Sequence, residues 1–176
     1  MTQLELQQRG LLDLIKGRSV VLDDAYLEQV AGSRELAMMR EITLWWRAFQ
    51  LSAQCRFTAR LLKRLACFDA VVADYFHNNA TSPFAEELGR DFLVSLWEYP
   101  DPLVQAVAQF EYGFLEARAG SNHAFEVVWD RNPEQVICAL EGGAELPSSE
   151  SGYLYRMQIG RNLPQMFMCA REFANL

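Results

Sequence analysis

Apolar residues recur at helical spacing from the start of the chain. Within residues 2–17, leucine and isoleucine cluster three or four positions apart, and Gly17 follows as a stop signal. Asp23 or Asp24 offers an N-cap for a short helix that runs through Val30. These signals predict two helices before residue 33.

A longer helical segment follows Ser33, whose hydroxyl has N-cap chemistry, and we expect a break in it before Phe68. Trp45, Trp46 and Phe49 stand at helical spacing, which predicts a core position for them. Further along, one side of the segment is apolar and the other is basic. The apolar side holds Leu51, Cys55, Thr58, Leu62, Leu65 and Ala66, and the basic side holds Arg56, Arg60, Lys63 and Arg64.

Later helix starts are marked by polar caps and prolines. The helical pattern continues over residues 69–77 and closes in a polar stretch. Ser82 and Pro83 then resemble an N-cap and a first-turn proline. Asp101 has the same relation to a helix over residues 102–118, which is the last long helix that the pattern predicts.

The periodicity changes after residue 122. Residues 125–129 alternate as in a half-buried strand, and a short helix over residues 135–141 ends at two glycines. Residues 153–159 alternate again and lead through a turn to residues 165–172, which can pair back as a hairpin. The order is strand, helix, hairpin.

These elements predict a mainly α fold with a small α/β C-terminal part. We expect a helical domain over residues 1–120 and a small strand–helix–β-hairpin domain over residues 121–176. The second domain is winged-helix-like and suited to peptide recognition.

Composition indicates a globular chain with an acidic balance. Of its 176 residues, 51% are hydrophobic, and the net charge of −7 opposes attraction to nucleic acid or an anionic membrane. The start of the chain lacks the basic region of a secretory signal, and no apolar run reaches the roughly 18 residues of a membrane span. We therefore expect a cytoplasmic protein whose dispersed cysteines are reduced thiols. They are Cys55, Cys67, Cys138 and Cys169.

Residues for metal or nucleotide chemistry are sparse. His77 and His123 stand outside any ligand-spaced motif, and no phosphate-binding glycine loop occurs. Because charged helix residues are usually solvated, we expect Glu111 and Glu116 on an exposed face. The sequence thus predicts no catalytic residue, metal or cofactor in this chain.

Two surfaces are candidates for binding. The basic side formed by Arg56, Arg60, Lys63 and Arg64 is either a solvated face or a docking surface for an acidic partner. Arginine makes up 14 of the 16 basic residues, and guanidinium suits interface ion pairs better than ammonium.

The C-terminal hairpin is the second candidate surface. Its aromatic and methionine side chains can cover the helical part, or its edge strand can take up an extended peptide through main-chain hydrogen bonds. The candidate peptide-binding residues are Tyr153, Tyr155, Arg156, Met157, Ile159, Met166 and Met168.

Three segments carry a family resemblance. The segment YPDPLVQAVAQFEYGFLEARAG resembles a helix of the partner proteins of multinuclear non-heme iron oxidative enzymes, which modify ribosomally made peptides. FEVVWDRNPEQVICALEGG and YLYRMQIGRNLPQMFMCARE fit the small C-terminal domain of those proteins in order and length. The similarity covers about residues 90 to 176 and is one of pattern rather than of a sharp signature.

The resemblance implies a non-catalytic partner subunit that forms a heterodimer with the iron enzyme. In that family the enzyme supplies iron and dioxygen chemistry, while the partner holds the leader of a ribosomal precursor peptide and presents its cysteine. The cysteine becomes an oxazolone and thioamide in the methanobactin branch, and a C-terminal cysteine loses its β-carbon in the 3-thiaglutamate branch. The compact helical half favours the 3-thiaglutamate type.

Two other classes of function stay open at this point. Helix followed by hairpin is also the end of a winged-helix DNA-binding domain, but the helix over residues 135–141 carries no lysine or arginine. Phosphate contacts would rest on Arg131, Arg156, Arg161 and Arg171, so we expect no nucleic-acid partner. A cofactor-independent enzyme has no residue set to support it.

Overall fold

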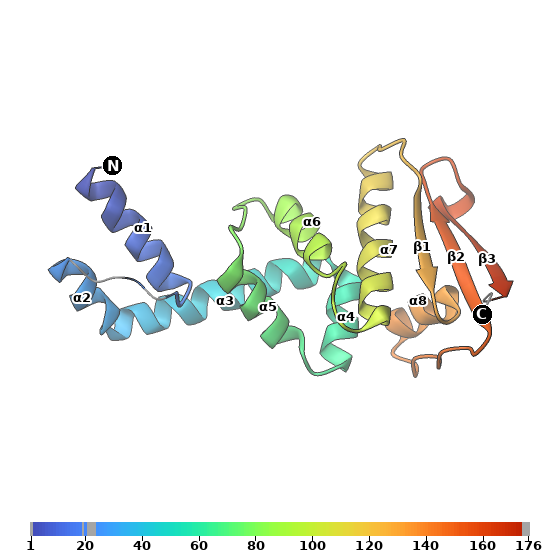
Figure 1. The fold of residues 1–176 in the computed structure, drawn as a ribbon, viewed down its shortest axis with the longest axis horizontal. Helices are drawn as coiled ribbons and strands as arrows, with labels where there is room; N and C mark the ends of the chain where they lie inside the picture. Colours follow the sequence, from blue (N-terminus) through green and yellow to red (C-terminus); the bar gives the residue numbers. More distant parts are fainter. Residues whose placement is uncertain (1, 19, 21–23, 174–176) are drawn as a thin grey trace. The chain divides into compact units, whose positions relative to one another are not determined.

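The computed structural model describes residues 2–18, 20 and 24–173 of the chain. Among these residues it is mainly helical and ends in a small three-stranded antiparallel sheet, as Figure 1 shows. The helices are α1 (Gln3–Ile15), α2 (Ala25–Ala31), α3 (Arg34–Gln54), α4 (Arg56–Arg64), α5 (Phe68–Asn78), α6 (Ala85–Ser95), α7 (Pro102–Arg118) and α8 (Pro133–Gly142). The strands are β1 (Phe125–Trp129), β2 (Tyr153–Ile159) and β3 (Phe167–Phe173), with a short 3-10 turn, η1 (Pro164–Met166), before β3.

Several of the described helices begin at the polar residues that the sequence predicts. Asp24 accepts hydrogen bonds from the first turn of α2, and Asp101 and Asn132 do the same for α7 and α8. The predicted alternative cap, Asp23, lies outside the described residues. One start differs: α6 begins after Phe84, and the Ser82 hydroxyl instead accepts the Phe84 N–H at 3.2 Å.

Contacts divide the chain into two compact units. The first comprises Met1–Gln50 and Asp69–Thr81, and the second comprises Leu51–Phe68 and Ser82–Leu176. The boundary predicted after residue 120 thus falls inside the second unit. The reason is that α7 packs directly on β1 and β2, so helices and sheet share one core there.

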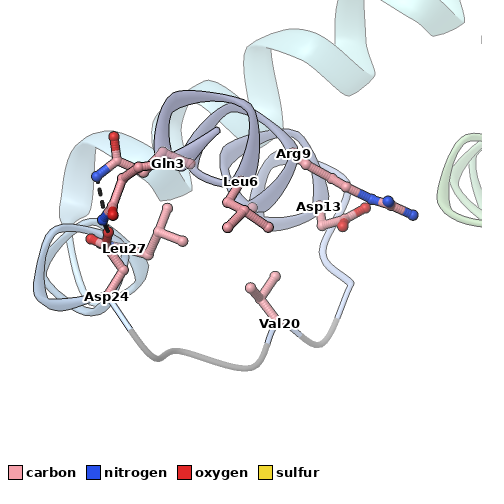
Figure 2. A pocket seen from close by; sticks show the side chains of 9 residues that line it. Gln3, Leu6, Arg9, Asp13, Val20, Asp24 and Leu27 are labelled. Atoms are coloured by element: carbon pink, nitrogen blue, oxygen red, sulfur yellow. Dashed lines mark hydrogen bonds between the residues drawn. The ribbon is translucent and has the colours of Figure 1, made fainter. Parts of the chain in front are cut away.

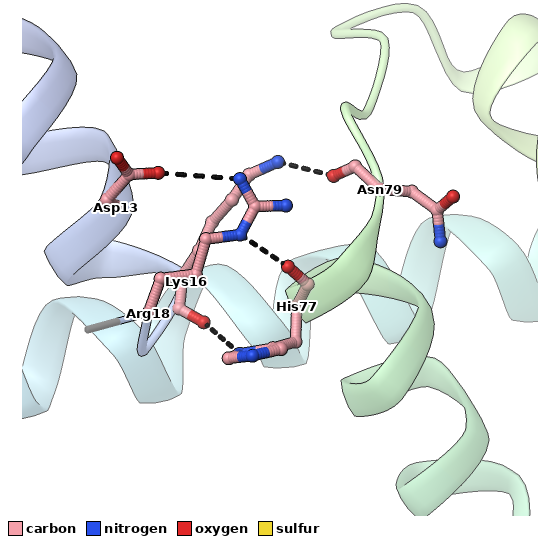
Figure 3. A network of polar contacts seen from close by, with 5 residues as sticks. All are labelled: Asp13, Lys16, Arg18, His77 and Asn79. Atoms are coloured by element: carbon pink, nitrogen blue, oxygen red, sulfur yellow. Dashed lines mark hydrogen bonds and ion pairs between the residues drawn. The ribbon is translucent and has the colours of Figure 1, made fainter. Parts of the chain in front are cut away.

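The first unit is built around a small leucine core. Leu14, Leu27 and Leu36 bring together α1, α2 and α3, and the guanidinium of Arg40 donates to the Leu14 carbonyl at 2.6 Å. The residues that follow α1 close the end of α5, as Figure 3 shows: Lys16 Nζ donates to the Asn79 carbonyl at 2.5 Å, and Arg18 Nε donates to the His77 carbonyl at 2.6 Å. Cations thus satisfy carbonyls that a helix C-terminus leaves without partners.

One expectation about α3 is wrong. Trp45, Trp46 and Phe49 were expected in the core, yet their exposed fractions are 65%, 50% and 55%. The helical spacing placed them correctly on one face. That face is not the one that packs on α1 and α2 through Leu36 and Arg40.

The second unit packs α7 closely against the sheet. Gly113 permits this approach, because a Cβ there would lie 3.1 Å from Phe125 Cβ and 3.2 Å from Ile159 Cδ1. The Phe110 ring from the same helix meets the buried Trp129 ring edge-on at a centroid distance of 6.1 Å. The aromatic core that results fixes the position of β1 and β2 beneath the helix.

A buried carboxylate joins α7 to α4. Glu111 is only 4% exposed, and its two oxygens accept the Phe57 and Thr58 N–H groups at 2.9 and 2.8 Å. These are N–H groups of the first turn of α4, whose N-cap residue Cys55 makes no side-chain cap. The expectation of a solvated Glu111 is therefore wrong, because this side chain supplies the missing cap from another helix.

The described helices also bear on membrane insertion. None of them combines the length and apolar character that crossing a bilayer requires.

Candidate functional site

Strand order places an open edge at β3. The order is β1-β2-β3, so β2 is paired on both sides and β3 is the last strand (Figure 1). Gly160 N–H donates to the Met166 carbonyl at 2.8 Å, which makes the next pair, Ile159 and Phe167, a pair without mutual hydrogen bonds. The alternation of an antiparallel ladder then points the N–H and C=O groups of every second β3 residue away from β2. These outward residues are Phe167, Cys169, Arg171 and Phe173.

The other edge of the sheet is shorter. The same alternation makes Phe125, Val127 and Trp129 of β1 the residues that bond β2. Only Glu126 and Val128 then point their backbone groups outward, against four residues on β3. A peptide strand therefore finds the longer run of unpaired backbone groups at β3.

Side chains of β3 are mostly exposed. Met168 and Phe173 are large apolar residues with exposed fractions of 53% and 76%. Met168 lies opposite Gln158 on one face of the sheet, and Phe173 lies opposite Tyr153 on the other. Both faces thus offer apolar surface next to the open edge.

Three of the predicted peptide-binding residues have buried side chains. Tyr155, Met157 and Ile159 are 5%, 0% and 0% exposed, so their side chains belong to the core. They lie on the central strand β2, which has no free edge. An edge made by this strand is therefore excluded. Met166 sits in the turn before β3 with a positive φ of 68°.

Arg156 has two carboxylate partners on the outer face of the sheet. Its Nη1 lies 2.6 Å from Glu126 Oε1, and its Nε lies 2.8 Å from Glu172 Oε2. The three residues form a ladder across β1, β2 and β3. Arg156 thus ties the three strands together, and its predicted contact with a peptide stays a prediction.

An aromatic and ionic cluster lies where β2 begins and β3 ends. The Arg171 guanidinium stacks 3.8 Å from the Tyr153 ring centroid and pairs with Glu150 at 2.7 Å. Tyr155 donates its hydroxyl to the same carboxylate at 2.8 Å, and burial with this hydrogen bond raises the pKa of Tyr155. The Phe173 ring lies 5.0 Å from that of Tyr153. This cluster presents a preformed aromatic surface at one end of the open edge.

The basic side of α4 is occupied by the chain itself. Arg60 donates to the Leu140 carbonyl at 3.1 Å, and Arg64 donates to the Ala139 and Ala144 carbonyls at 2.5 and 2.6 Å. The Ala139 and Leu140 carbonyls belong to the C-terminal end of α8, where cations are favourable, and Ala144 lies just after that helix.

The other two basic residues of α4 also have partners. Arg56 pairs with Glu141 of α8 at 2.6 Å. Lys63 donates to the Ser52 hydroxyl at 3.0 Å and lies over the Phe68 ring. The four residues therefore hold the second unit together. These contacts do not test their predicted role in binding a partner, which stays a prediction.

The described residues also bear on metal binding. No group of three or more histidine, cysteine or acidic residues in that part of the chain could hold a metal ion. Burial raises the pKa of the Cys55 thiol and, less strongly, that of Cys169. Raised thiol pKa values disfavour the nucleophilic thiolate.

One cavity of about 390 Å³ lies between α1 and α2 in the first unit. Figure 2 shows Asp24 bound by Gln3 at its rim, and Gln7 also donates to Asp24 at 2.9 Å. The Gln7 hydrogen bond is the main cause that lowers the pKa of Asp24. Because Asp24 also caps α2, its carboxylate already has a structural use.

Comparisons with known proteins add no family. No protein-family model, curated protein or solved structure matches this chain.

Proposed function

We propose that this chain is a non-catalytic partner subunit that binds the leader of a ribosomal precursor peptide and presents its cysteine to a multinuclear iron oxidative enzyme. The observation that carries the proposal is the open β3 edge, with four outward residues and apolar side chains on both faces. The strand–helix–hairpin order and the resemblance over residues 90–176 support the class of partner.

A peptide strand added at β3 would form the same kind of backbone hydrogen bonds that join the strands of the sheet. Four outward residues provide four N–H donors and four C=O acceptors along β3. Each backbone hydrogen bond contributes about 0.5 to 1.5 kcal/mol net, so half of them with some apolar burial can reach the roughly 8 kcal/mol of micromolar binding. Peptide recognition by strand addition is a widely used mode.

Side chains next to the edge set a preference. A strand beside β3 places alternate residues against Met168 on one face and against Phe167 and Phe173 on the other. We expect apolar peptide residues at those positions. The stacked Arg171 and Tyr153, together with Glu150, make one end of the edge more polar.

The geometry gives less support to winged-helix DNA binding than to peptide binding at β3. The helix that would enter a groove is α8, whose Glu134 is exposed and whose Glu141 pairs with Arg56. Its C-terminal end is held by Arg60 and Arg64 of α4. A surface with carboxylates and engaged cations has little to offer phosphates.

The edge itself is tested with proline. A display library of random linear 12-residue peptides would be selected on the full chain, and the enriched peptides tested against Cys169→Pro and Cys169→Ala. Cys169 points its N–H outward, so proline removes a donor for the peptide while the alanine variant controls for loss of the thiol. Met168→Pro is a different case, because its N–H faces β2 and its loss lowers the melting temperature.

We expect binding to the alanine variant and at least tenfold weaker binding to Cys169→Pro at an unchanged melting temperature. Equal binding by both variants would refute the edge assignment. The partner role needs a second assay. Co-expression with a multinuclear iron oxidative enzyme and its cysteine-containing precursor should give modified peptide only when this chain is present and able to bind through β3.

A further inference from the structure

The outer face of α3 carries the largest group of exposed apolar side chains on one described element. Trp45 is 65% exposed, Phe49 55% and Ile42 53%. Six exposed residues form this outer stripe: Met38, Met39, Ile42, Trp45, Trp46 and Phe49. All six residues belong to the first compact unit.

Spacing along the outer stripe follows a helix-pairing pattern. Met38, Ile42, Trp45 and Phe49 are separated by four, three and four residues, which is the alternation of a coiled-coil seam. The opposite face of α3 is already used, since Leu36 packs on Leu14 and Leu27. The helix thus has two packing faces, and only the inner one is covered within the described part of the chain.

The aromatic members of the stripe form one continuous surface. The Phe49 ring stacks on Trp45 at a centroid distance of 6.0 Å and on Trp46 at 5.5 Å. Stacking fixes these side chains in place before any partner arrives, which lowers the entropy cost of binding. The aromatic part of the stripe is therefore preorganised.

Its area is close to what a small stable interface needs. Large side chains that are about half exposed give on the order of 600 Å² of apolar surface here, at the upper end for patches on monomers. A standard interface buries about 800 Å² on each partner, so the stripe and a modest polar rim suffice.

The chemistry of the stripe favours a second copy of this chain as occupant. None of its six residues is charged, so it offers no charge complementarity to an acidic or basic partner. Two nearby cations already have acceptors within the first unit: Arg40 donates to the Leu14 carbonyl, and Arg47 donates to the Gln50 side chain. With a net charge of −7, the chain is also poorly suited to an anionic lipid surface.

We propose that two copies of this chain pair through α3, with the outer stripes antiparallel about a twofold axis. In this arrangement Ile42 packs on the partner's Trp45, and Met38 packs on the partner's Phe49, and each contact occurs twice. The proposal is independent of peptide binding, because the outer stripe and β3 belong to different compact units.

Sedimentation velocity of the full chain between about 1 and 200 μM tests the proposal. We expect a monomer–dimer equilibrium for the native sequence and at least a 100-fold rise in the dissociation constant for Ile42→Glu and for Trp45→Glu, because each buries an unpaired charge at two places. Phe84→Glu is the matched control, an exposed apolar residue outside the stripe, and should leave the constant unchanged.

Each alternative outcome has a clear meaning. A chain that stays monomeric at 200 μM overturns the proposal. A dimer that withstands both substitutions lies on another surface and also overturns it. Should either variant fail to fold, protection of the Trp45 and Trp46 amides and side chains on dimerisation, measured by NMR on the native chain, decides between these outcomes.

Discussion

Removal of Glu111 tests how the second unit is held together. In Glu111→Ala, the N–H groups of Phe57 and Thr58 lose both acceptors in a site where Glu111 is 4% exposed. A buried unsatisfied donor costs about 1 to 3 kcal/mol, so two of them lower the free energy of unfolding by about 2 to 6 kcal/mol. Urea unfolding followed by circular dichroism measures this loss, and amide exchange locates it at the start of α4.

The pH dependence of the same residue has a definite sign. Burial raises the pKa of Glu111 above its usual 4.5, against the opposing effect of the two N–H donors and Arg56. The free energy of unfolding that the raised pKa of Glu111 contributes is therefore fully present below the unfolded-state pKa. It is lost as the pH rises through the folded-state pKa. The advantage of the native chain over Glu111→Gln, which cannot titrate, should be larger in acid than at neutral pH.

The matched control lies on the same helix. Glu116 is also on α7 and pairs with Arg90 at 2.7 Å, but its side chain is 24% exposed. Glu116→Ala should cost about 1 kcal/mol or less. Equal losses for the two alanine variants, or an unchanged exchange rate of the Phe57 and Thr58 amides, would refute the capping role of Glu111.

Three further predictions concern the contacts that position the sheet. Arg64→Ala should lower stability by about 1 to 3 kcal/mol and speed amide exchange in α8, whereas Lys63→Ala, which touches no α8 carbonyl, should leave that exchange unchanged. Gly113→Val should cost about 1 to 3 kcal/mol in thermal unfolding, because its side chain has no room against Phe125. Asn132→Ala should cost about 1 kcal/mol through the lost cap of α8, and a cost near zero would mean that Pro133 alone sets this start.

Much of the secondary structure is predictable because its signals are local. Asp24, Ser33 and Asn132 each bond N–H groups within three residues of themselves, so their sequence context is sufficient. The alternation of β1 and the helical spacing of α7 are local in the same sense. The mainly helical fold with a small C-terminal sheet follows from such signals.

The missed features depend on partners far along the chain. Glu111 lies more than fifty residues along the chain from the two N–H groups that it caps. Arg64 lies about eighty residues from the carbonyls at and just after the end of α8 to which it donates. Strand order also depends on pairing between distant segments. β2 is the central strand because it pairs with β1, which lies before α8 in the sequence, as well as with β3. Helical spacing shows that Trp45 and Phe49 share a face, but it does not show what covers that face.

Backbone amide exchange along β3, measured on the full chain with and without a peptide selected from the random library, shows whether a peptide adds to this edge as a strand. If a peptide adds as a strand, the amides of Phe167, Cys169 and Arg171, which point outward in the free chain, gain protection by tenfold or more. Amides that already face β2, such as that of Met168, change less. Protection confined to residues before 120, with the outward β3 amides unchanged, would contradict the account and assign peptide binding to the helices.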